Sequence, residues 1–569
     1  MIQRIKKFYH SHLDDSSIYL TTVSGVASTK KQMVRYFNNK VKAIDLITTK
    51  SFQVTVNPGN REPVICQLNK DDFGNSVGLR NPGLDVALKE IKELRSEGLD
   101  TLLNISVSAS RVEDFITLIN AFDPYADSIE LNFSCPHASA GFGSSIGTDI
   151  CIATSYVEEI RKACKDQQSA LIIKLTPNVD NIGEIAKAVV AAGADGIAAI
   201  NTVGPVVHKD SSGNVILNNK LGGKGGKSGA WVKARALECV KEIRQAVGPD
   251  VIIYAMGGMY TPQDVYEMHL AGADTIGLGS VFGKVRQQDW IDFTSYIKES
   301  ALALINGKEY NKVDYFKEFN QMEYTAHKVV DICEHSKDML IITLDGQLDC
   351  ISGQFAFLWL PGLGEKPFSV AHNKPLTFLI RKRGFFTKAL FDLKVGDTLY
   401  TRGLYGKALD IKPGKKNILL AGGSGAAVLP SVCRLLTKDA NIETFVGTSA
   451  SSIGIDNKPL FHDYLSSYGK YTVIEDAGKP GRVLDYINEV EEDTKAFIIG
   501  PEIFSSFAAK KFLTLGLKPE DIYISLERNT LCGIGICGEC VAGDRLTCQY
   551  GTFMTYDYLY KNAKELIQW

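Results

Sequence analysis

Eight short apolar runs in the first 310 residues constrain the fold of this chain more than any other feature. Amphipathic stretches such as VEEIRKACKD separate them. Buried parallel strands read as continuous Val, Ile and Leu runs of this kind. Eight strand–helix units of this total length predict a TIM (β/α)8 barrel over residues 1–310, and a doubly wound open sheet remains the alternative. The runs are IYLTT (18–22), AIDLIT (43–48), TLLNIS (101–106), SIELNF (128–133), ALIIKL (170–175), GIAAIN (196–201), VIIYAM (251–256) and TIGLGS (275–280).

The sequence changes character after Asn311. Residues 311–412 contain shorter alternating runs with Gly and Pro turns, such as GQFAFLWLPG, which predict a small antiparallel β-barrel. Residues 413–518 return to an α/β pattern and predict a Rossmann-like domain, because NILLAGGSGAAVLPSVCRLL reads as a strand, a Gly-rich turn and a helix. Residues 519–569 have little periodicity and carry four clustered cysteines. A chain of 569 residues is too long for one hydrophobic core, so several domains are expected.

The charge balance and the positions of the cysteines bear on which partners the protein binds and in which cellular compartment it works. The 63 Lys and Arg residues against 65 Asp and Glu lack the basic excess that nucleic acids or anionic membranes attract. No apolar run reaches the roughly 18 residues of a membrane span, and the first residues lack the apolar core of a secretory signal. Eight of the twelve cysteines stand singly, which is not the pattern of a disulfide framework. We therefore expect a cytoplasmic protein.

The clustered cysteines have the spacing C-x4-C-x2-C-x7-C, and the first three match the plant-type [2Fe–2S] pattern. Intervening glycines let the backbone wrap a cluster closely and leave N–H groups free to point at its sulfurs. A structural zinc site is the alternative, although zinc sites usually use C-x2-C pairs separated by a longer insert. The spacing thus favours an iron–sulfur cluster on Cys532, Cys537, Cys540 and Cys548.

Each apolar run ends in small or polar residues, and the active site of a TIM barrel lies at these carboxyl ends. The Gly-Gly and Gly-Ser pairs after the last two runs stand where such barrels bind phosphate, which predicts a phosphate-bearing cofactor. Lys174 is a charge inside a buried run, so it either faces a flavin or forms a structural ion pair with Glu130. The end residues are Ser24, Gly25, Thr49, Lys50, Asn104, Asn132, Ser134, Cys135, Lys174, Asn201, Thr202, Gly257, Gly258, Gly279 and Ser280.

These motifs resemble one family, the class 1B dihydroorotate dehydrogenases, in which an FMN barrel subunit partners a ferredoxin-reductase-like electron-transfer subunit. The barrel motifs are NSVGLRNPG (75–83), ELNFSCPH (130–137), KLTPN (174–178), INTVGP (200–205), GGKSG (225–229), MGGMYTPQDV (256–265) and GLGS (277–280). The electron-transfer motifs are KPFSV (366–370), GFFTKAL (384–390), GGSGAAVLP (422–430), IIGPE (498–502) and SLERNTLCGIGICGEC (525–540). The resemblance covers nearly the whole chain, with both subunits fused in one polypeptide.

For the barrel, the resemblance implies oxidation of dihydroorotate, with Cys135 as the base that removes a proton from C5 while C6 gives hydride to FMN. A planar anion with amide edges calls for a cation and amide side chains, and a thiolate suits a weakly acidic C–H. The implied substrate residues are Lys50, Asn75, Ser76, Val77, Gly78, Leu79, Asn132, Asn201 and Thr202. The implied FMN residues are Ser24, Thr49, Lys50, Asn104, Asn132, Lys174, Ile200, Gly229, Gly257, Gly258, Gly279 and Ser280.

For the second half, the resemblance implies FAD and NAD sites and electrons that pass singly through the [2Fe–2S] cluster to FAD and on to NAD. It also implies a homodimer formed through the barrel. The implied FAD residues are Lys366, Pro367, Phe368, Ser369, Leu379, Ile380, Arg381, Phe386 and Thr387, and the NAD residues are Gly422, Gly423 and Gly425.

Two positions depart from the family pattern. His137 stands where the family usually has Asn, as in the related dihydropyrimidine dehydrogenases, so reduction of uracil or thymine remains an alternative. Those enzymes typically carry two [4Fe–4S] clusters on C-x2-C-x2-C runs, which this sequence lacks. Lys366 replaces the usual Arg of the FAD motif, and it can neutralise a phosphate but cannot bind one bidentately. A third interpretation is an NAD(P)H-linked electron-transfer module with a non-catalytic barrel, against which Cys135 and Lys50 argue.

Overall fold

The computed structural model describes residues 17–133, 146–437, 440–448, 454, 458–475 and 482–568. The chain divides into two compact units. The first comprises Met1–Gln321 together with Ile534–Gly538, and the second comprises Met322–Gly533 together with Glu539–Trp569. Within the described ranges, no helix combines the length and the apolar character needed to cross a membrane.

The first unit is built on a closed barrel of eight parallel strands, so the predicted TIM-type fold is confirmed and the open-sheet alternative is excluded. Strands that follow one another in the barrel are hydrogen-bonded neighbours, and the last pairs with the first. All eight predicted apolar runs form its strands. They are β1 (Leu20–Thr22), β2 (Leu46–Thr48), β5 (Leu102–Val107), β6 (Ser128–Asn132), β7 (Ala170–Lys174), β8 (Gly196–Ala199), β11 (Ile252–Met256) and β12 (Thr275–Leu278).

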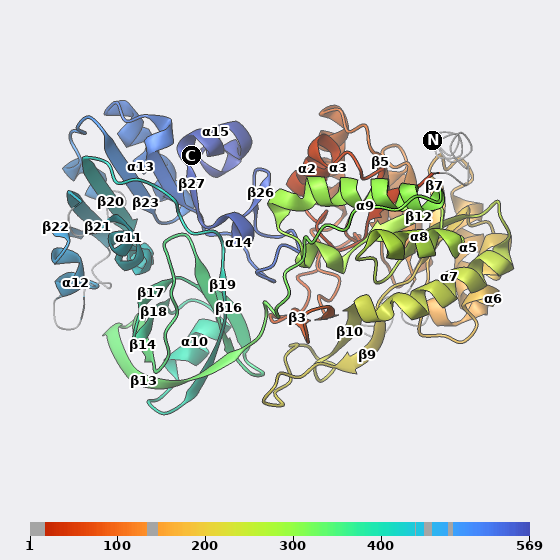
Figure 1. Cartoon of the computed structure of the whole chain (residues 1–569), viewed down its shortest axis with the longest axis horizontal. Helices are drawn as coiled ribbons and strands as arrows, with labels where there is room; N and C mark the ends of the chain where they lie inside the picture. Colours follow the sequence, from red (N-terminus) through yellow and green to blue (C-terminus); the bar gives the residue numbers. More distant parts are fainter. Residues whose placement is uncertain are drawn as a thin grey trace. The chain divides into compact units, whose positions relative to one another are not determined.

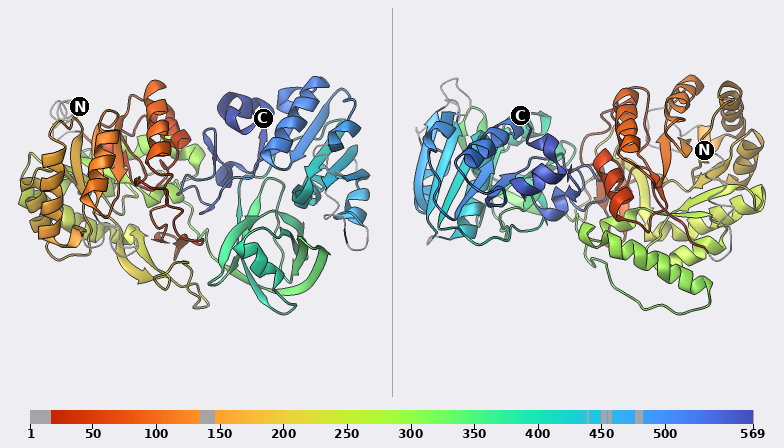
Figure 2. Two further views of the ribbon diagram at one scale, coloured as in Figure 1. Left: turned by 180° about the vertical axis from the view of Figure 1, so that it is seen from behind. Right: turned by 90° about the horizontal axis from the view of Figure 1, so that it is seen from above.

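Helices surround the barrel strands (Figure 2) and bury one apolar face each. Side chains from several barrel strands, among them Leu102, Ile172 and Tyr254, form one hydrophobic cluster. Helix α8 begins at Pro262 because Thr261 and Asp264 form a capping box there. The helices are α2 (Lys31–Lys40), α3 (Leu84–Ser96), α4 (Val112–Phe122), α5 (Ile150–Ala163), α6 (Ile182–Ala191), α7 (Lys233–Val247), α8 (Pro262–Leu270) and α9 (Trp290–Ile305).

A small antiparallel sheet, absent from the sequence prediction, accompanies the barrel. Its order is β3-β4-β10-β9, and it contains the Gly-rich segment KGGKSG. Glycine is a weak strand former, so sequence alone gave no reason to expect a strand there. The strands are β3 (Ile65–Gln67), β4 (Asp72–Asn75), β9 (Val203–Val207) and β10 (Lys224–Gly229).

The second unit begins with an antiparallel sheet, as predicted, which lies beside helix α10 (Phe385–Phe391; Figure 1). Its pairing runs as seven strands in the order β16-β15-β19-β13-β14-β18-β17, and no pairing closes this order into a ring among the described residues. The strands are β13 (Thr325–Ser336), β14 (Met339–Leu344), β15 (Phe355–Leu360), β16 (Gly364–Phe368), β17 (Val370–Asn373), β18 (Leu376–Arg381) and β19 (Thr398–Tyr405).

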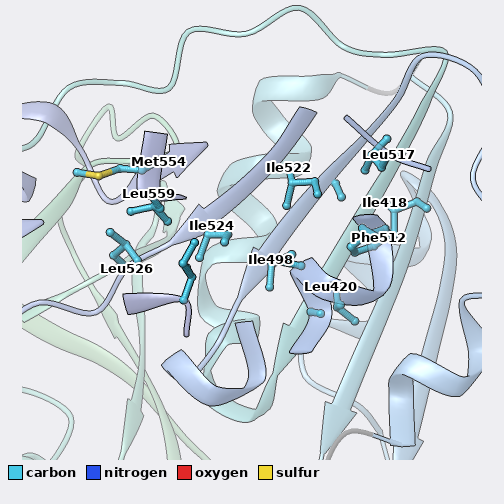
Figure 3. Packing of buried hydrophobic residues seen from close by; sticks show 14 of the residues in the cluster. Ile418, Leu420, Ile498, Phe512, Leu517, Ile522, Ile524, Leu526, Met554 and Leu559 are labelled. Carbon is cyan, nitrogen blue, oxygen red and sulfur yellow. The ribbon is translucent and has the colours of Figure 1, made fainter. Parts of the chain in front are cut away.

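An α/β sheet follows in the order β22-β21-β20-β23-β24-β27, with all pairs parallel except the last. Figure 3 shows the apolar cluster on one of its faces, where Ile418, Ile498 and Phe512 pack together. The strands are β20 (Lys416–Gly422), β21 (Ile442–Thr448), β22 (Gly469–Glu475), β23 (Thr494–Ile499), β24 (Ile522–Ser525) and β27 (Phe553–Thr555), and the helices are α11 (Leu429–Leu436), α12 (His462–Ser466) and α13 (Glu502–Thr514).

The cysteine segment contributes little regular structure. A hairpin of β25 (Val541–Ala542) and β26 (Arg545–Leu546) is followed by α14 (Thr547–Tyr550), and α15 (Tyr556–Asn562) lies near the chain end. Gly533, Gly535 and Gly538 all have positive φ, a backbone conformation that glycine adopts without steric cost.

Candidate functional site

A continuous hydrogen-bond network joins the polar side chains at the carboxyl ends of the barrel strands. Ser51 is its centre, with its Oγ 3.2 Å from Ser24 Oγ, 2.9 Å from Ser106 Oγ and accepting from Asn132 Nδ2 at 3.2 Å. Ser106 in turn donates to Glu130 at 3.0 Å. The predicted residues Ser24 and Asn132 are therefore joined through Ser51, and Ser106 links Ser51 to Glu130. The sequence analysis missed both Ser51 and Ser106.

Lys174 and Glu130 extend this network into the barrel. Lys174 Nζ lies 3.6 Å from Glu130 Oε1, and both side chains are buried. Asn104 Nδ2 also approaches Glu130, at 3.4 Å from Oε2. The ion pair raised as an alternative in the sequence analysis is thus present. It does not exclude a cofactor role, because Lys174 is paired in register with the predicted site residue Asn132.

The predicted substrate segment 75–79 is held by asparagine side chains. Ser76 Oγ accepts from Asn60 Nδ2 at 3.0 Å and from Asn219 Nδ2 at 2.6 Å. Asn57 donates to the Gly78 carbonyl at 3.2 Å, and Asn81 donates to the Leu79 carbonyl at 2.8 Å. Asn75 ends β4, and Val77 accepts from the Asn60 backbone at 3.0 Å. The segment is therefore held by these four hydrogen bonds from asparagine side chains where it leaves β4.

Asn178 links the ends of two barrel strands near the other predicted substrate residues. Its Nδ2 donates to the Thr202 carbonyl at 3.3 Å, and its Oδ1 accepts from the Gly204 backbone at 3.0 Å. Asn201 Oδ1 accepts from the Thr202 backbone at 2.8 Å, and Ile200 donates its backbone N–H to Met256 at 3.0 Å. Asn201, Thr202 and Ile200 thus lie together after β8.

The predicted phosphate residues also converge. A Cβ added at Gly258 would lie 3.0 Å from the Ala230 carbonyl oxygen, which places Gly258 against the turn that Gly229 begins. Tyr260 donates to Ser280 Oγ at 3.0 Å, and burial raises the pKa of Tyr260. The positive φ of Gly229, Gly257 and Gly258 is a conformation that side chains rarely adopt. Gly279 forms the N-cap of the turn Ser280–Gly283.

The remaining predicted barrel residues divide between described and undescribed positions. Lys50 is buried directly after Thr49, whose Oγ1 accepts from the Ser106 backbone at 3.1 Å. Ser134, Cys135 and His137 lie outside the described residues. The role of Cys135 as the base therefore stays a prediction.

In the second unit, β16, β18 and α10 carry the predicted FAD residues. The rings of Phe368 and Phe386 are 6.4 Å apart, and Thr387 Oγ1 accepts from the Gly384 backbone at 3.0 Å. Ser369 lies between β16 and β17, directly after Phe368. The other predicted FAD residues lie on two strands: Lys366 and Pro367 on β16, and Leu379, Ile380 and Arg381 on β18.

The predicted NAD glycines lie where β20 leads into α11: Gly422 ends β20, and Gly423 and Gly425 lie in the turn that follows. Gly425 packs on β23 so closely that a Cβ there would lie 2.7 Å from the Ile499 carbonyl oxygen. Gly423 has positive φ, and the nearest atom to an added Cβ is Arg381 Nη1 at 3.8 Å. Open space beside a glycine turn, with a guanidinium next to it, fits the phosphates of a dinucleotide. The ring of Phe504 packs against Gly422 and Gly500, and the sequence analysis did not include Phe504 in this site.

The cluster cysteines are all buried, and none of the eleven described cysteines forms a disulfide. Cys548 exchanges thiol hydrogen bonds with Cys532 and Cys540, which raise the pKa of Cys548 and lower that of Cys540. Cys537 belongs to the segment Ile534–Gly538 of the first unit. Among the described residues no three His, Cys, Asp or Glu side chains are arranged around one metal ion. Buried thiols in mutual contact are the donor set that an iron–sulfur cluster requires.

Comparison with known proteins assigns the barrel half to a family. Residues 18–292 match the family model described as dihydroorotate dehydrogenase. The chain is 36% identical over 268 residues to the dihydroorotate dehydrogenase B (NAD(+)) catalytic subunit of Methanocaldococcus jannaschii, covering 45% of this chain and 83% of that protein. It is also 36% identical over 246 residues to dihydroorotate dehydrogenase A (fumarate) of Lactobacillus delbrueckii subsp. bulgaricus, covering 42% of this chain and 76% of that protein.

A solved dihydroorotate dehydrogenase from Eimeria tenella aligns with a TM-score of 0.43 and 18% identity, covering 52% of this chain and 84% of that one. The dihydroorotate dehydrogenase B (NAD(+)) catalytic subunits of Methanocaldococcus jannaschii and Pyrococcus abyssi are matched over 83% and 92% of their length, at 36% and 33% identity, and these matches cover about half of this chain. The closed eight-stranded barrel lies within the range that the family model matches. The chain belongs to the dihydroorotate dehydrogenase family.

Proposed function

We propose that this chain oxidises dihydroorotate to orotate at an FMN held in the barrel, and passes the two electrons through a [2Fe–2S] cluster and FAD to NAD. The observation that carries the proposal is the network at the barrel mouth, which links Ser24, Asn132 and Lys174 through Ser51, Ser106 and Glu130. These six residues come from five segments of the chain, because Glu130 and Asn132 both lie on β6.

The residues present fit a flavin and an anionic substrate. Lys174 offers a buried ammonium, and Lys50 offers a second buried cation beside the strand ends. A bound flavin would supply a hydride acceptor. Cys135 would take the C5 proton, while Lys50 would neutralise the substrate carboxylate and the amide side chains of Asn75, Asn132 and Asn201 would orient the ring.

The acceptor depends on the second half of the chain. The NAD(+)-linked relatives reach 40% identity and up to 92% coverage of their own length, against 36% and 76% for the fumarate-linked relative, so the barrel matches favour the NAD-linked type. The open Gly423 turn beside Arg381 and the buried thiols of Cys532, Cys540 and Cys548 support the NAD-linked route. His137 favours a second candidate substrate, a dihydropyrimidine such as dihydrouracil.

Anaerobic flavin reduction with a panel of donors tests the proposal. Dihydroorotate and NADH should each bleach the flavin, whereas dihydrouracil should not. Extraction should yield FMN and FAD in equal amounts, with two irons and two labile sulfides per chain. Bleaching by dihydrouracil alone would establish the second candidate, and a chain without FMN would contradict both.

The Ser51→Ala variant tests the role of the network itself. It removes the shared partner of Ser24, Ser106 and Asn132, and each unsatisfied group costs about 1–3 kcal/mol. Flavin reduction by dihydroorotate should slow by about tenfold, which corresponds to about 1.4 kcal/mol. The control is Ser155→Ala, because the Ser155 hydroxyl contacts only the exposed Glu159 carboxylate at 3.2 Å in its own helix.

A further inference from the structure

Arg402 is a fully buried guanidinium at the centre of the second unit. Its side chain and that of Glu365 are both 0% exposed. Arg402 Nε and Nη2 each donate to Glu365 at 2.6 Å, in the bidentate geometry that gives the strongest Arg–carboxylate pairs. Tyr324 donates a further 2.6 Å hydrogen bond to the same carboxylate. A buried charge pair with this degree of satisfaction has a specific structural or functional role.

The remaining donors of Arg402 reach the cysteine segment. Nη1 donates to the Cys532 carbonyl at 2.8 Å and to Tyr405 Oη at 2.7 Å, while Nη2 donates to the Leu531 carbonyl at 3.2 Å. These bonds and the Glu365 pair use all five N–H groups of the guanidinium. Its plane also stacks on Phe357, with Cζ 3.8 Å from the ring centroid. Arg402 is therefore fixed in position and orientation.

Cys532 and Glu365 bind different edges of the Arg402 guanidinium. Glu365 binds the Nε and Nη2 edge, whereas Nη1 makes no contact with Glu365 and faces Cys532 and Tyr405. Burial opposes the charge of Arg402, but Glu365 together with Tyr405 and Tyr324 outweighs burial, so the pKa of Arg402 is raised. The positive end of the pair thus points at the backbone of the first cysteine of the cluster motif.

The same pair ties the cysteine segment to the strand of the predicted FAD residues. Glu365 precedes Lys366 on β16, and alternation along a strand points the two side chains to opposite faces. Glu365 therefore reaches the buried interior, where it holds Arg402 of β19, while Lys366 lies on the other face. A rigid link runs from β16 through Glu365 and Arg402 to Cys532.

We propose that Arg402 is a positioning residue for the redox centre on Cys532, which fixes the first thiolate ligand relative to the FAD strand and raises the reduction potential of that centre. The inference rests on the [2Fe–2S] cluster of the proposed function. A cation on the cysteine side favours the form of the cluster that has gained an electron, because that form carries one more negative charge.

Arg402→Lys in the full-length, flavin-loaded protein is the test. Lysine keeps the charge and can pair with Glu365, but its compact ammonium cannot also reach Cys532, Leu531 and Tyr405. We expect iron release to a chelator to be about tenfold faster. We also expect the reduced-to-oxidised cluster ratio at a fixed solution potential to fall about tenfold, which is 59 mV for one electron. A loaded variant with the parent potential and the parent release rate would overturn the inference.

Arg434→Lys is the matched control. Arg434 also donates to backbone and side-chain acceptors of another element, at 2.8 Å to the Ala371 carbonyl and 3.2 Å to Asn373 Oδ1. Its substitution should lower thermal stability and leave the cluster potential and its visible circular dichroism unchanged. An equal shift of potential in Arg434→Lys would indicate general loosening of the unit and would also overturn the inference.

If Arg402→Lys does not fold, Tyr405→Phe is a second variant that tests the same inference. It keeps both charges and the ring, and removes only the oxygen that fixes Nη1 beside Cys532. A smaller fall in potential is expected, and an unchanged potential would contradict the proposal. Iron and acid-labile sulfide in the parent protein are measured first. A parent without them overturns the proposed electron route and this inference together, whereas a loaded parent with unshifted variants overturns this inference alone.

Discussion

Lys174 and Glu130 face each other inside the barrel, with Nζ 3.6 Å from Oε1 and side-chain exposures of 6% and 1%. Glu130 is further bonded to Ser106 at 3.0 Å. Such a pair is costly to break, because the partner left behind is a buried charge without compensation.

Glu130→Gln should therefore destabilise the barrel unit by about 3–5 kcal/mol, measured by urea unfolding. The double variant Glu130→Gln/Lys174→Met should recover part of this loss, since it removes both charges. Asp557→Asn breaks the exposed helical pair with Lys561 and should cost about 0.5 kcal/mol at most. A Glu130→Gln variant as stable as this control would contradict the coupling.

Cys135→Ala should bind orotate almost normally, because Lys50 and the amide side chains hold the substrate. Its flavin should be reduced by dihydroorotate about 10²- to 10⁴-fold more slowly, the usual effect of losing a positioned general base. NADH reduction of the second half should be unchanged. Stopped-flow reduction normalised to bound flavin measures both, and a rate within about threefold of the parent would remove Cys135 from the mechanism.

Cys135→Ser extends this test. A hydroxyl is a much weaker acid than a thiol of pKa about 8.5, so some activity should return only at high pH. A structural cysteine would give the opposite pattern, with lower stability and near-normal rates in the folded protein.

Cys540→Ser should uncouple the two flavins. Loss of one buried thiolate should abolish the cluster, while dihydroorotate still reduces FMN and NADH still reduces FAD. Turnover from dihydroorotate to NAD should collapse. Cys433→Ser, at a buried cysteine outside the cluster motif, is the control for the loss of a thiol. Full turnover in Cys540→Ser would show that electrons take another route.

His208 should make the barrel unit sensitive to acid. Burial lowers its pKa below the ordinary histidine value of about 6.5, and its Nε2 has no hydrogen-bond partner among the described residues. Between the lowered pKa and 6.5 the unfolded chain binds more protons, so stability is complete above pH 6.5 and falls as the pH decreases. His208→Gln should flatten this slope in pH-dependent unfolding, whereas His462→Gln, at an exposed residue, should not.

The sequence predicted the parts of the molecule that repeat a physical pattern. Buried parallel strands must be continuously apolar, so all eight barrel strands were found, and so was the strand–turn–helix at Gly422. Ser51 and Ser106 were missed because a small polar residue at a strand end looks the same whether it caps a helix or joins a network. Arg402 and Glu365 were missed because 36 residues separate them, and each charge alone resembles a surface position in an alternating strand.

Five residues of the first unit, Ile534–Gly538, are encoded after almost the whole of the second. During synthesis the barrel strands all emerge before residue 322, and residues 322–533 follow before this last piece is made. At about 5–20 residues per second that interval is about 10–40 s. A nascent barrel therefore waits with one short stretch of its own surface unfilled. Any truncation that stops before residue 534 removes these five residues from the first unit.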